Sequence, residues 1–246
     1  IDPVSAVIIR DGLYRRAAEL TEFSYLHLIA RTPDIAPRVY PRRGEDEKLT
    51  GIVAERRDQF MCETPEELEG SFDPGYEDFL AEVKAAAVLL DWIEEHSEDA
   101  ILNAHKVEPG DLLRLVQMAD WLLYSTDELA GLFGHKDLRK SLVQLRLRVE
   151  KGTKADVIPL LGLQGVGRVR ARALYNAGLR TIGDIRKATP SELAAVPLIG
   201  TKLAKKIMEQ AGGLIRSEEW EELRSTRDET EQSLLTEYSN SNCAAD

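Results

Sequence analysis

The sequence has few cysteines, few aromatic residues and no long apolar run. Its two cysteines, Cys62 and Cys243, lie far apart and match no metal-ligand spacing. Two isolated thiols indicate a reduced, cytoplasmic protein without a disulfide framework. No stretch approaches the roughly 20 apolar residues of a membrane-spanning helix, so no membrane partner is expected. Alternating β-branched patterns are almost absent, which argues against strands.

The net charge of −11 conceals an uneven distribution along the chain. Residues 151–212 hold eleven basic and four acidic residues, a net charge of +7, so the remainder carries −18. A solvated charged face would mix both signs. A basic module on an acidic body is instead typical of a protein that binds nucleic acid in one orientation.

Apolar residues recur at spacings of three and four through most of the chain, which predicts an all-α fold. Proline and glycine separate the helical segments. The predicted helices of the first part cover 4–20, 21–30, 45–61, 75–96, 98–105, 109–133 and 136–151. We therefore expect three regions, namely a seven-helix bundle over 1–150, a compact second domain over 151–212 and an acidic, largely disordered tail over 213–246.

The second region contains two copies of one motif, over 163–174 and 196–207. Each copy has an apolar residue, a short turn, a glycine and then a helix with a small alanine four residues on. Each also follows a short apolar helix. Two copies with the same flanking helices predict a small tandem helix-hairpin-helix domain.

The turn of the first copy, Gly165-Val166-Gly167, has the residue types that a phosphate site needs. Both glycines are expected to allow positive φ and close approach of a ligand, while Val166 anchors the turn to the core. The N–H groups at the start of the following helix form an anion site that reads no base. Nearby basic side chains add Coulomb attraction to the backbone. These are Arg168, Arg170, Arg172, Lys202 and Lys205.

The second copy has Leu198 where the first has Gly165. A positive φ would be costly for leucine, so its backbone contact with phosphate is in doubt. We expect this hairpin to act mainly as a support for the first, with Lys202 and Lys205 retained as candidate contacts.

The helix around residues 111–124 carries two flat side chains away from its apolar side. On a wheel at about 100° per residue, Arg114 and Trp121 lie opposite the apolar stripe and two turns apart. Bases of a single strand can stack on both groups, each stack contributing about 1–3 kcal/mol whatever the sequence. The alternative is a central helix whose Trp121 packs in the core, and the pattern alone does not decide between them.

Four segments together resemble motifs of one protein family and occur in the same order as in that family. They are 25–34, 106–112, 119–124 and 163–174. The family is the archaeal Hjm group of superfamily 2 DNA helicases, related to the animal HELQ helicase. The resemblance implies that residues 1–150 are a ratchet domain in which Arg114 and Trp121 stack on the translocating strand. It also implies that residues 151–212 grip the emerging single strand.

The resemblance further implies ATP-binding motor domains whose sequence motifs are absent from this sequence. There is no Gly-x-x-x-x-Gly-Lys-Ser/Thr phosphate loop, so no cofactor is expected in this chain and no ATP hydrolysis by it alone. ATP and Mg²⁺ would bind to motor domains preceding Ile1. The expected function is therefore binding of single-stranded and forked DNA within an ATP-dependent 3′–5′ helicase of replication-fork repair and recombination.

Two alternatives and several partners accompany this expectation. The chain could be a free-standing, non-enzymatic DNA-binding scaffold, or an RNA-helicase-type relative. The expected partners are single-stranded and forked DNA and the motor domains of the same protein, in a nucleoid-associated cytoplasmic location. A sliding clamp is a further candidate, because residues 232–238 partly resemble a clamp-binding box. A single-strand-binding protein is another candidate partner.

Overall fold

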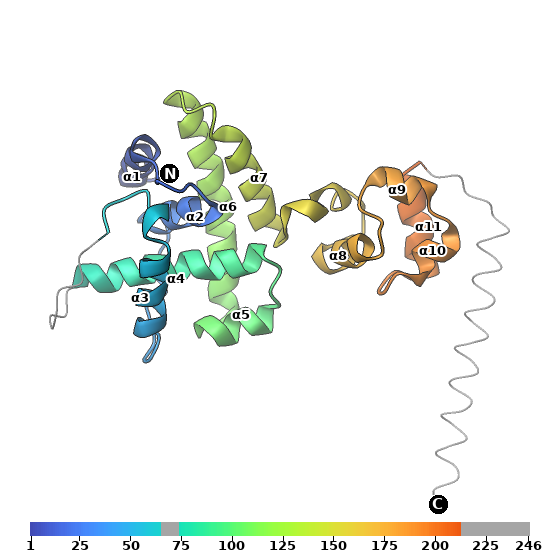
Figure 1. Ribbon diagram of the computed structural model, residues 1–246, viewed down its shortest axis with the longest axis horizontal. Coiled ribbons are helices and arrows are strands. Elements are labelled where there is room, and N and C mark those ends of the chain that lie inside the picture. The colour runs from blue at the N-terminus through green and yellow to red at the C-terminus, as the bar shows by residue number, and fades with distance from the viewer. Residues whose placement is uncertain (65–73, 213–246) are drawn as a thin grey trace, which may run out of the picture. The chain divides into compact units, whose positions relative to one another are not determined.

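In the computed structural model, residues 1–64 and 74–212 are described, and all regular elements within them are helices (Figure 1). The all-α prediction is confirmed. The predicted tail over 213–246, with its clamp-like segment, lies outside the described residues. The chain divides into two compact units, of which the first spans Ile1–Ala155 and the second begins at Asp156. No helix in the described ranges is long and apolar enough to cross a membrane.

Unit 1 is a bundle of seven α-helices within the described residues, as predicted. Two of its helices are shorter than expected: α1 ends where Arg16 takes a positive φ of 54°, and α3 gives way to the 3₁₀ turn η1. The elements are α1 (Pro3–Arg15), α2 (Glu22–Ala30), α3 (Asp46–Glu55), η1 (Arg57–Gln59), α4 (Pro74–Ile93), α5 (Glu98–His105), α6 (Pro109–Leu132) and α7 (Arg139–Lys151).

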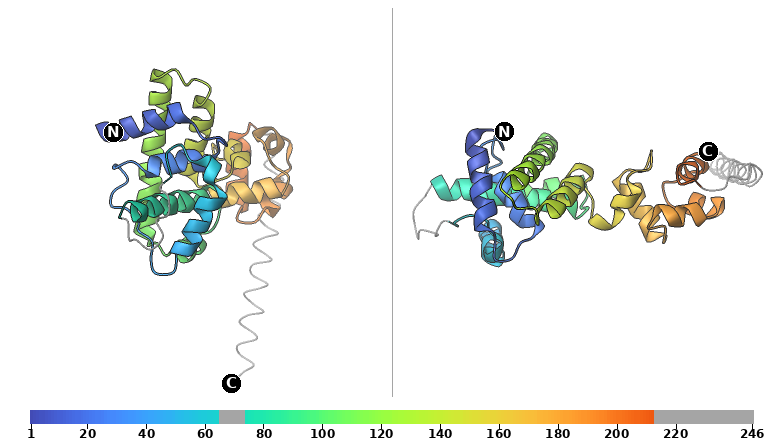
Figure 2. Two further views of the ribbon diagram at one scale, coloured as in Figure 1. Left: turned by 60° about the vertical axis from the view of Figure 1, so that its left-hand side comes forward. Right: turned by 90° about the horizontal axis from the view of Figure 1, so that it is seen from above.

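Helix α6 forms the axis of unit 1 (Figures 1 and 2). It runs for 24 residues, packs along α7, and also contacts α1, α2, α4 and α5. Leu115, Ala119, Leu122 and Leu123 are fully buried on its inner side. Burial of each leucine stabilises the fold by about 1.5–3 kcal/mol, so α6 is fixed in its rotation about its own axis. Its outer side is thereby fixed as well.

Two ionisable side chains are buried together between α3 and α4. Lys84 is completely buried, and its Nζ donates to Glu45 Oε2 at 2.7 Å and to the Tyr40 carbonyl at 3.1 Å. Burial alone would raise the pKa of Glu45. Hydrogen bonds from Lys84 and from the Arg42 amide outweigh that effect, so the pKa of Glu45 lies below its usual value. This pair ties the segment before α3 to the middle of α4.

A histidine lies in the aromatic part of the same core. His27 is fully buried, with Phe60 edge-on at a centroid distance of 4.7 Å and Phe79 at 5.4 Å. Burial and the nearby Arg31 lower the pKa of His27 to about 3. The ring is therefore neutral at pH 7 and acts as a core residue.

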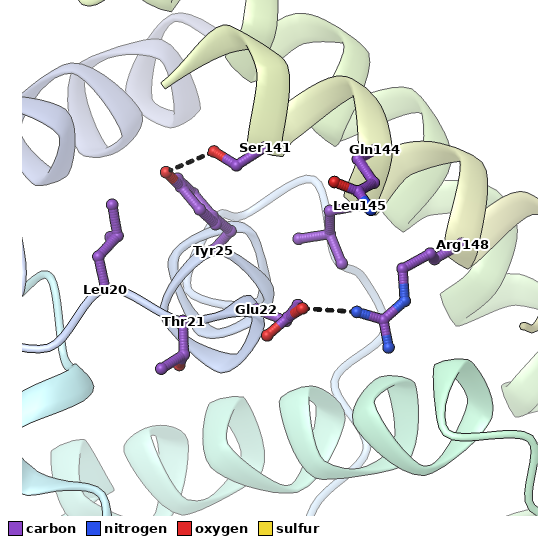
Figure 3. A pocket seen from close by; sticks show the side chains of 8 residues that line it. All are labelled: Leu20, Thr21, Glu22, Tyr25, Ser141, Gln144, Leu145 and Arg148. Atoms are coloured by element: carbon purple, nitrogen blue, oxygen red, sulfur yellow. Dashed lines mark hydrogen bonds and ion pairs between the residues drawn. The ribbon is translucent and has the colours of Figure 1, made fainter. Parts of the chain in front are cut away.

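The end of α7 is firmly attached to the rest of unit 1. Arg148 is buried, and its guanidinium donates to Glu22 and to Glu94; Figure 3 shows the side chain reaching from α7 to Glu22 on α2. Gly152 ends the helix at φ 64°, and a Cβ there would meet the Trp92 ring at 2.5 Å. These contacts fix the C-terminal end of α7 in unit 1.

Unit 2 is built from short helices around a core of its own. The tandem motif occupies it as predicted, and the anchoring side chains Val166, Ala171, Ile199 and Ala204 are all buried. The elements are η2 (Ala155–Leu160), α8 (Arg168–Asn176), α9 (Ile182–Lys187), α10 (Pro190–Ala195) and α11 (Thr201–Gln210).

Candidate nucleic-acid interface

The two hairpin turns of unit 2 have the same backbone. Gly165 has a φ of 83° and Leu198 a φ of 65°, so leucine adopts the conformation that glycine adopts in the first copy. Each turn is closed by one hydrogen bond of 3.1 Å, from Val166 N to Leu163 O and from Ile199 N to Val196 O. The cost of positive φ for leucine, which put the phosphate contact of this hairpin in doubt, does not prevent the turn, and the second hairpin is not a distorted copy.

The glycine at the end of each turn, Gly167 or Gly200, has a different backbone conformation from the residue two positions before it. Gly167 has a φ of −86° and Gly200 a φ of −82°, which is extended backbone open to any residue. The prediction of positive φ at Gly167 is thus wrong. A Cβ on Gly167 would meet nothing within 4 Å, so neither backbone nor packing demands glycine there. Because glycine has no side chain, the N-cap residue of α8 makes no side-chain hydrogen bond to the amides of the first turn.

The helices of unit 2 begin in two ways. Helices α9 and α10 start with capping boxes, in which Thr181 pairs with Asp184 and Thr189 with Glu192. These side chains satisfy amide groups of the first turn. Helices α8 and α11 start at glycine N-caps, and within the described residues no side chain caps either one. Among the described helices α8 to α11, the two hairpin helices are therefore the ones that leave their first-turn amides available to an external anion.

The charge around these helix starts follows the same division. The first turns of α8 and α11 contain no acidic residue, and Arg168, Arg170 and Lys202 lie there instead. The positive end of a helix dipole is destabilised by basic residues and stabilised by an anion. Among the described residues of this unit, Asp184 and Glu192 cap α9 and α10 instead. This arrangement favours a phosphate at both hairpins.

Two of the predicted arginine contacts are also engaged within the unit. Arg170 donates from Nη1 to the Gly165 carbonyl at 2.9 Å and from Nε to the Leu198 carbonyl at 3.1 Å. Its side chain thus joins the two turns. The sequence did not predict this role; the equivalent position of the second repeat holds Leu203, which cannot form such a bridge. Arg172 holds Asp156 with both terminal nitrogens, at 2.9 and 2.7 Å. Their contact with DNA stays a prediction.

The outer side of α6 is the second candidate surface, on unit 1. Trp121 is 39% exposed, so the alternative of a core tryptophan does not describe this structure. The Arg114 side chain is 24% exposed, and its Nη2 lies 3.5 Å from Asp111 Oδ1. Its Nη1 has no hydrogen-bond partner among the described residues. The two side chains lie about 10 Å apart along the helix axis, two turns from each other.

The difference between the two turn positions predicts opposite effects on stability. Leu198→Gly should stabilise unit 2 by up to about 1 kcal/mol, because the positive φ no longer strains a side chain. Gly165→Ala should destabilise it by more than about 1 kcal/mol, because φ is positive and the new Cβ would lie 2.9 Å from Leu203 Cδ1. Hydrogen–deuterium exchange of peptides from 157–212 measures both. Equal effects of the two variants would contradict the shared turn geometry.

The comparisons with known proteins match both units. The family described as "Archaeal helicase, domain 4" matches residues 23–152, which is more than half of the chain. The chain belongs to this family. A second family, described as "SAM-like Helix-hairpin-helix tandem", matches residues 157–212. The Hjm-type resemblance and the tandem hairpin domain are thereby confirmed.

Similar proteins carry the name "ATP-dependent DNA helicase Hel308". The protein from Methanocella arvoryzae is 38% identical over 214 residues, covering 86% of this chain and 28% of the relative. That from Thermococcus kodakarensis is 38% identical, covering 86% and 18%. That from Caldivirga maquilingensis is 39% identical, covering 88% and 29%. The chain therefore spans less than a third of the length of these relatives.

Proposed function

We propose that this chain holds single-stranded and forked DNA within an ATP-dependent 3′–5′ DNA helicase that acts in replication-fork repair and recombination. The observation that carries the proposal is the pair of basic helix starts at α8 and α11, which no described side chain caps, in the same unit as two acid-capped helices. The names of the relatives and the archaeal helicase domain support it. The protein then works in the cytoplasm, on the DNA of the nucleoid.

The two surfaces suit different parts of a strand. The helix starts of unit 2 bind phosphates through backbone amides, and Lys202 and Lys205 add charge along the backbone. Arg114 and Trp121 on α6 bind bases through their flat faces. Neither contact reads a base edge, so the strand can move past both surfaces without a change in affinity. A helicase requires such indifference to sequence.

Nucleotide chemistry is assigned to other domains of the protein. The sequence has no phosphate loop, so we assign the binding of ATP and Mg²⁺ to other domains. Motor domains of the same protein would supply ATP hydrolysis, and this chain would supply the grip that turns motor movement into strand displacement. A sliding clamp or a single-strand-binding protein would be a further partner.

Salt dependence tests the phosphate contacts. We expect the 246-residue chain to bind a labelled single strand and a fork, with log K falling linearly with log salt. Lys202→Ala should reduce the slope by about 0.7, which is one phosphate contact on a single strand. The matched control is Lys187→Ala, an exposed lysine of α9 in the same unit, which should leave the slope unchanged. Fluorescence anisotropy at several salt concentrations gives both slopes.

Three outcomes would contradict the proposal. Absence of binding to either DNA would remove the proposed function. RNA that competes as well as DNA would favour the RNA-helicase-type relative. An equal slope for Lys202→Ala and the parent chain would exclude a phosphate contact by the Lys202 side chain.

A further inference from the structure

A second aromatic side chain lies on the outer side of α6, beyond Trp121. Tyr124 follows Trp121 by three residues, so it lies about one helical turn, or 4.5 Å, farther along the axis. It is 46% exposed, more than Trp121 itself. No hydrogen bond of its hydroxyl occurs within the described part of the chain. Nearly half of the residue is exposed and it is not part of the core of unit 1, so its ring is accessible to a ligand.

Helix α7 supplies a cation for this ring. The guanidinium carbon of Arg146 lies 5.0 Å from the centre of the Tyr124 ring, in a cation–π contact. Arg146 is fixed there by Asp120, with Nε and Oδ1 2.8 Å apart. Asp120, which positions the guanidinium, immediately precedes Trp121 in the sequence. Two flat groups from two helices are thus held in place directly beside the proposed Trp121 stacking site.

We propose that the Tyr124–Arg146 pair is a further stacking position for a base of the single strand, one helical turn beyond Trp121. The inference rests on the proposed function, because it extends the Arg114–Trp121 stripe in the same direction. A base binds there through its π face, by the same chemistry that operates at an aromatic side chain. Asp120 neutralises Arg146, so stacking and not phosphate attraction accounts for the contact. Its contribution is therefore insensitive to salt, unlike that of the hairpins.

A ladder of oligonucleotide lengths tests the position. With oligodeoxythymidylates from about 4 to about 16 nucleotides, affinity rises as each stacking position is reached. Tyr124→Ala should weaken binding of the longer oligonucleotides by about 5-fold or more, at both low and high salt. Consider the shortest oligonucleotide whose binding is weakened by Trp121→Ala. The affinity of Tyr124→Ala for it should lie within about twofold of the affinity of the parent chain. Tyr124→Phe, which keeps the ring, should bind like the parent chain.

Leu132→Ala is the matched control, because Leu132 is an exposed apolar side chain farther along the same helix. It should have no effect at any length. If Trp121→Ala weakens binding and Tyr124→Ala does not at any length, the inference is wrong and the proposed function stands. If neither variant changes binding, the proposed function of α6 fails as well. A loss for Tyr124→Ala that is equal at every length would show a general defect and would overturn the assignment; melting by circular dichroism then identifies misfolding.

Discussion

Trp121→Ala is expected to weaken binding of single-stranded DNA by about 1–3 kcal/mol, which is about 5- to 150-fold, and Arg114→Ala by a similar amount. The two side chains lie on one stripe of a helix whose opposite side is packed in the core, so loss of either leaves the fold intact. The double variant reports their coupling, because residues that contact one ligand need not act additively. Anisotropy with a labelled single strand measures all three.

The control is chosen from the same helix turn. Leu113 is adjacent to Arg114 and strongly exposed, but it offers no flat group, so Leu113→Ala should bind like the parent chain. Tryptophan fluorescence adds an independent signal, because a base stacked on Trp121 quenches the indole. Trp121→Phe should abolish most of the quenching while retaining most of the affinity. Unchanged affinity in both alanine variants would refute stacking on α6.

Lys84→Met is expected to destabilise unit 1 by about 3–5 kcal/mol, because it leaves the buried carboxylate of Glu45 without its partner. Methionine keeps the apolar volume, so a cavity is not the cause. The effect should be smaller at low pH, where Glu45 takes up a proton and is buried uncharged. Urea unfolding followed by tryptophan fluorescence measures it, since Trp92 and Trp121 both lie in unit 1.

The double variant separates a missing partner from a general packing defect. Replacing both members of a buried ion pair by apolar residues is often neutral or stabilising. Lys84→Met together with Glu45→Leu should therefore recover more than half of the lost stability. A double variant as unstable as Lys84→Met would show that the lysine stem, and not its charge, matters at this position. DNA binding at temperatures below the transition should be unchanged in both variants.

Periodicity carried most of the fold prediction, because helices that bury one side reveal it in the spacing of apolar residues. The ends of helices were harder to predict. α1 stops at Arg16 in a backbone conformation that favours glycine, so no sequence signal marks the end. The Lys84–Glu45 pair joins residues 39 apart, and composition gives no indication of such a long-range contact. Local rules cannot predict contacts that arise only when distant helices pack.

Those features of the candidate site that the two hairpins share could be predicted from the sequence. The features in which the two hairpins differ could not. The two hairpins could be aligned residue by residue, so the turns, their buried anchors and the basic helix starts followed from the sequence. Leu198 broke the alignment, and the low preference of leucine for positive φ did not decide its conformation, because the surrounding turn outweighs the preference of one residue. The bridge made by Arg170 could not be foreseen either, since it depends on the approach of two turns 33 residues apart.

That bridge gives unit 2 a property that neither hairpin has alone. One rigid guanidinium holds both turns, so the interval between the two helix starts is set by the protein and not by its ligand. If both starts bind phosphates, the unit acts as a gauge: a strand fits when the spacing of its phosphates matches a fixed interval. Such a unit distinguishes nucleic acids by the spacing of their phosphates and not by their base sequence.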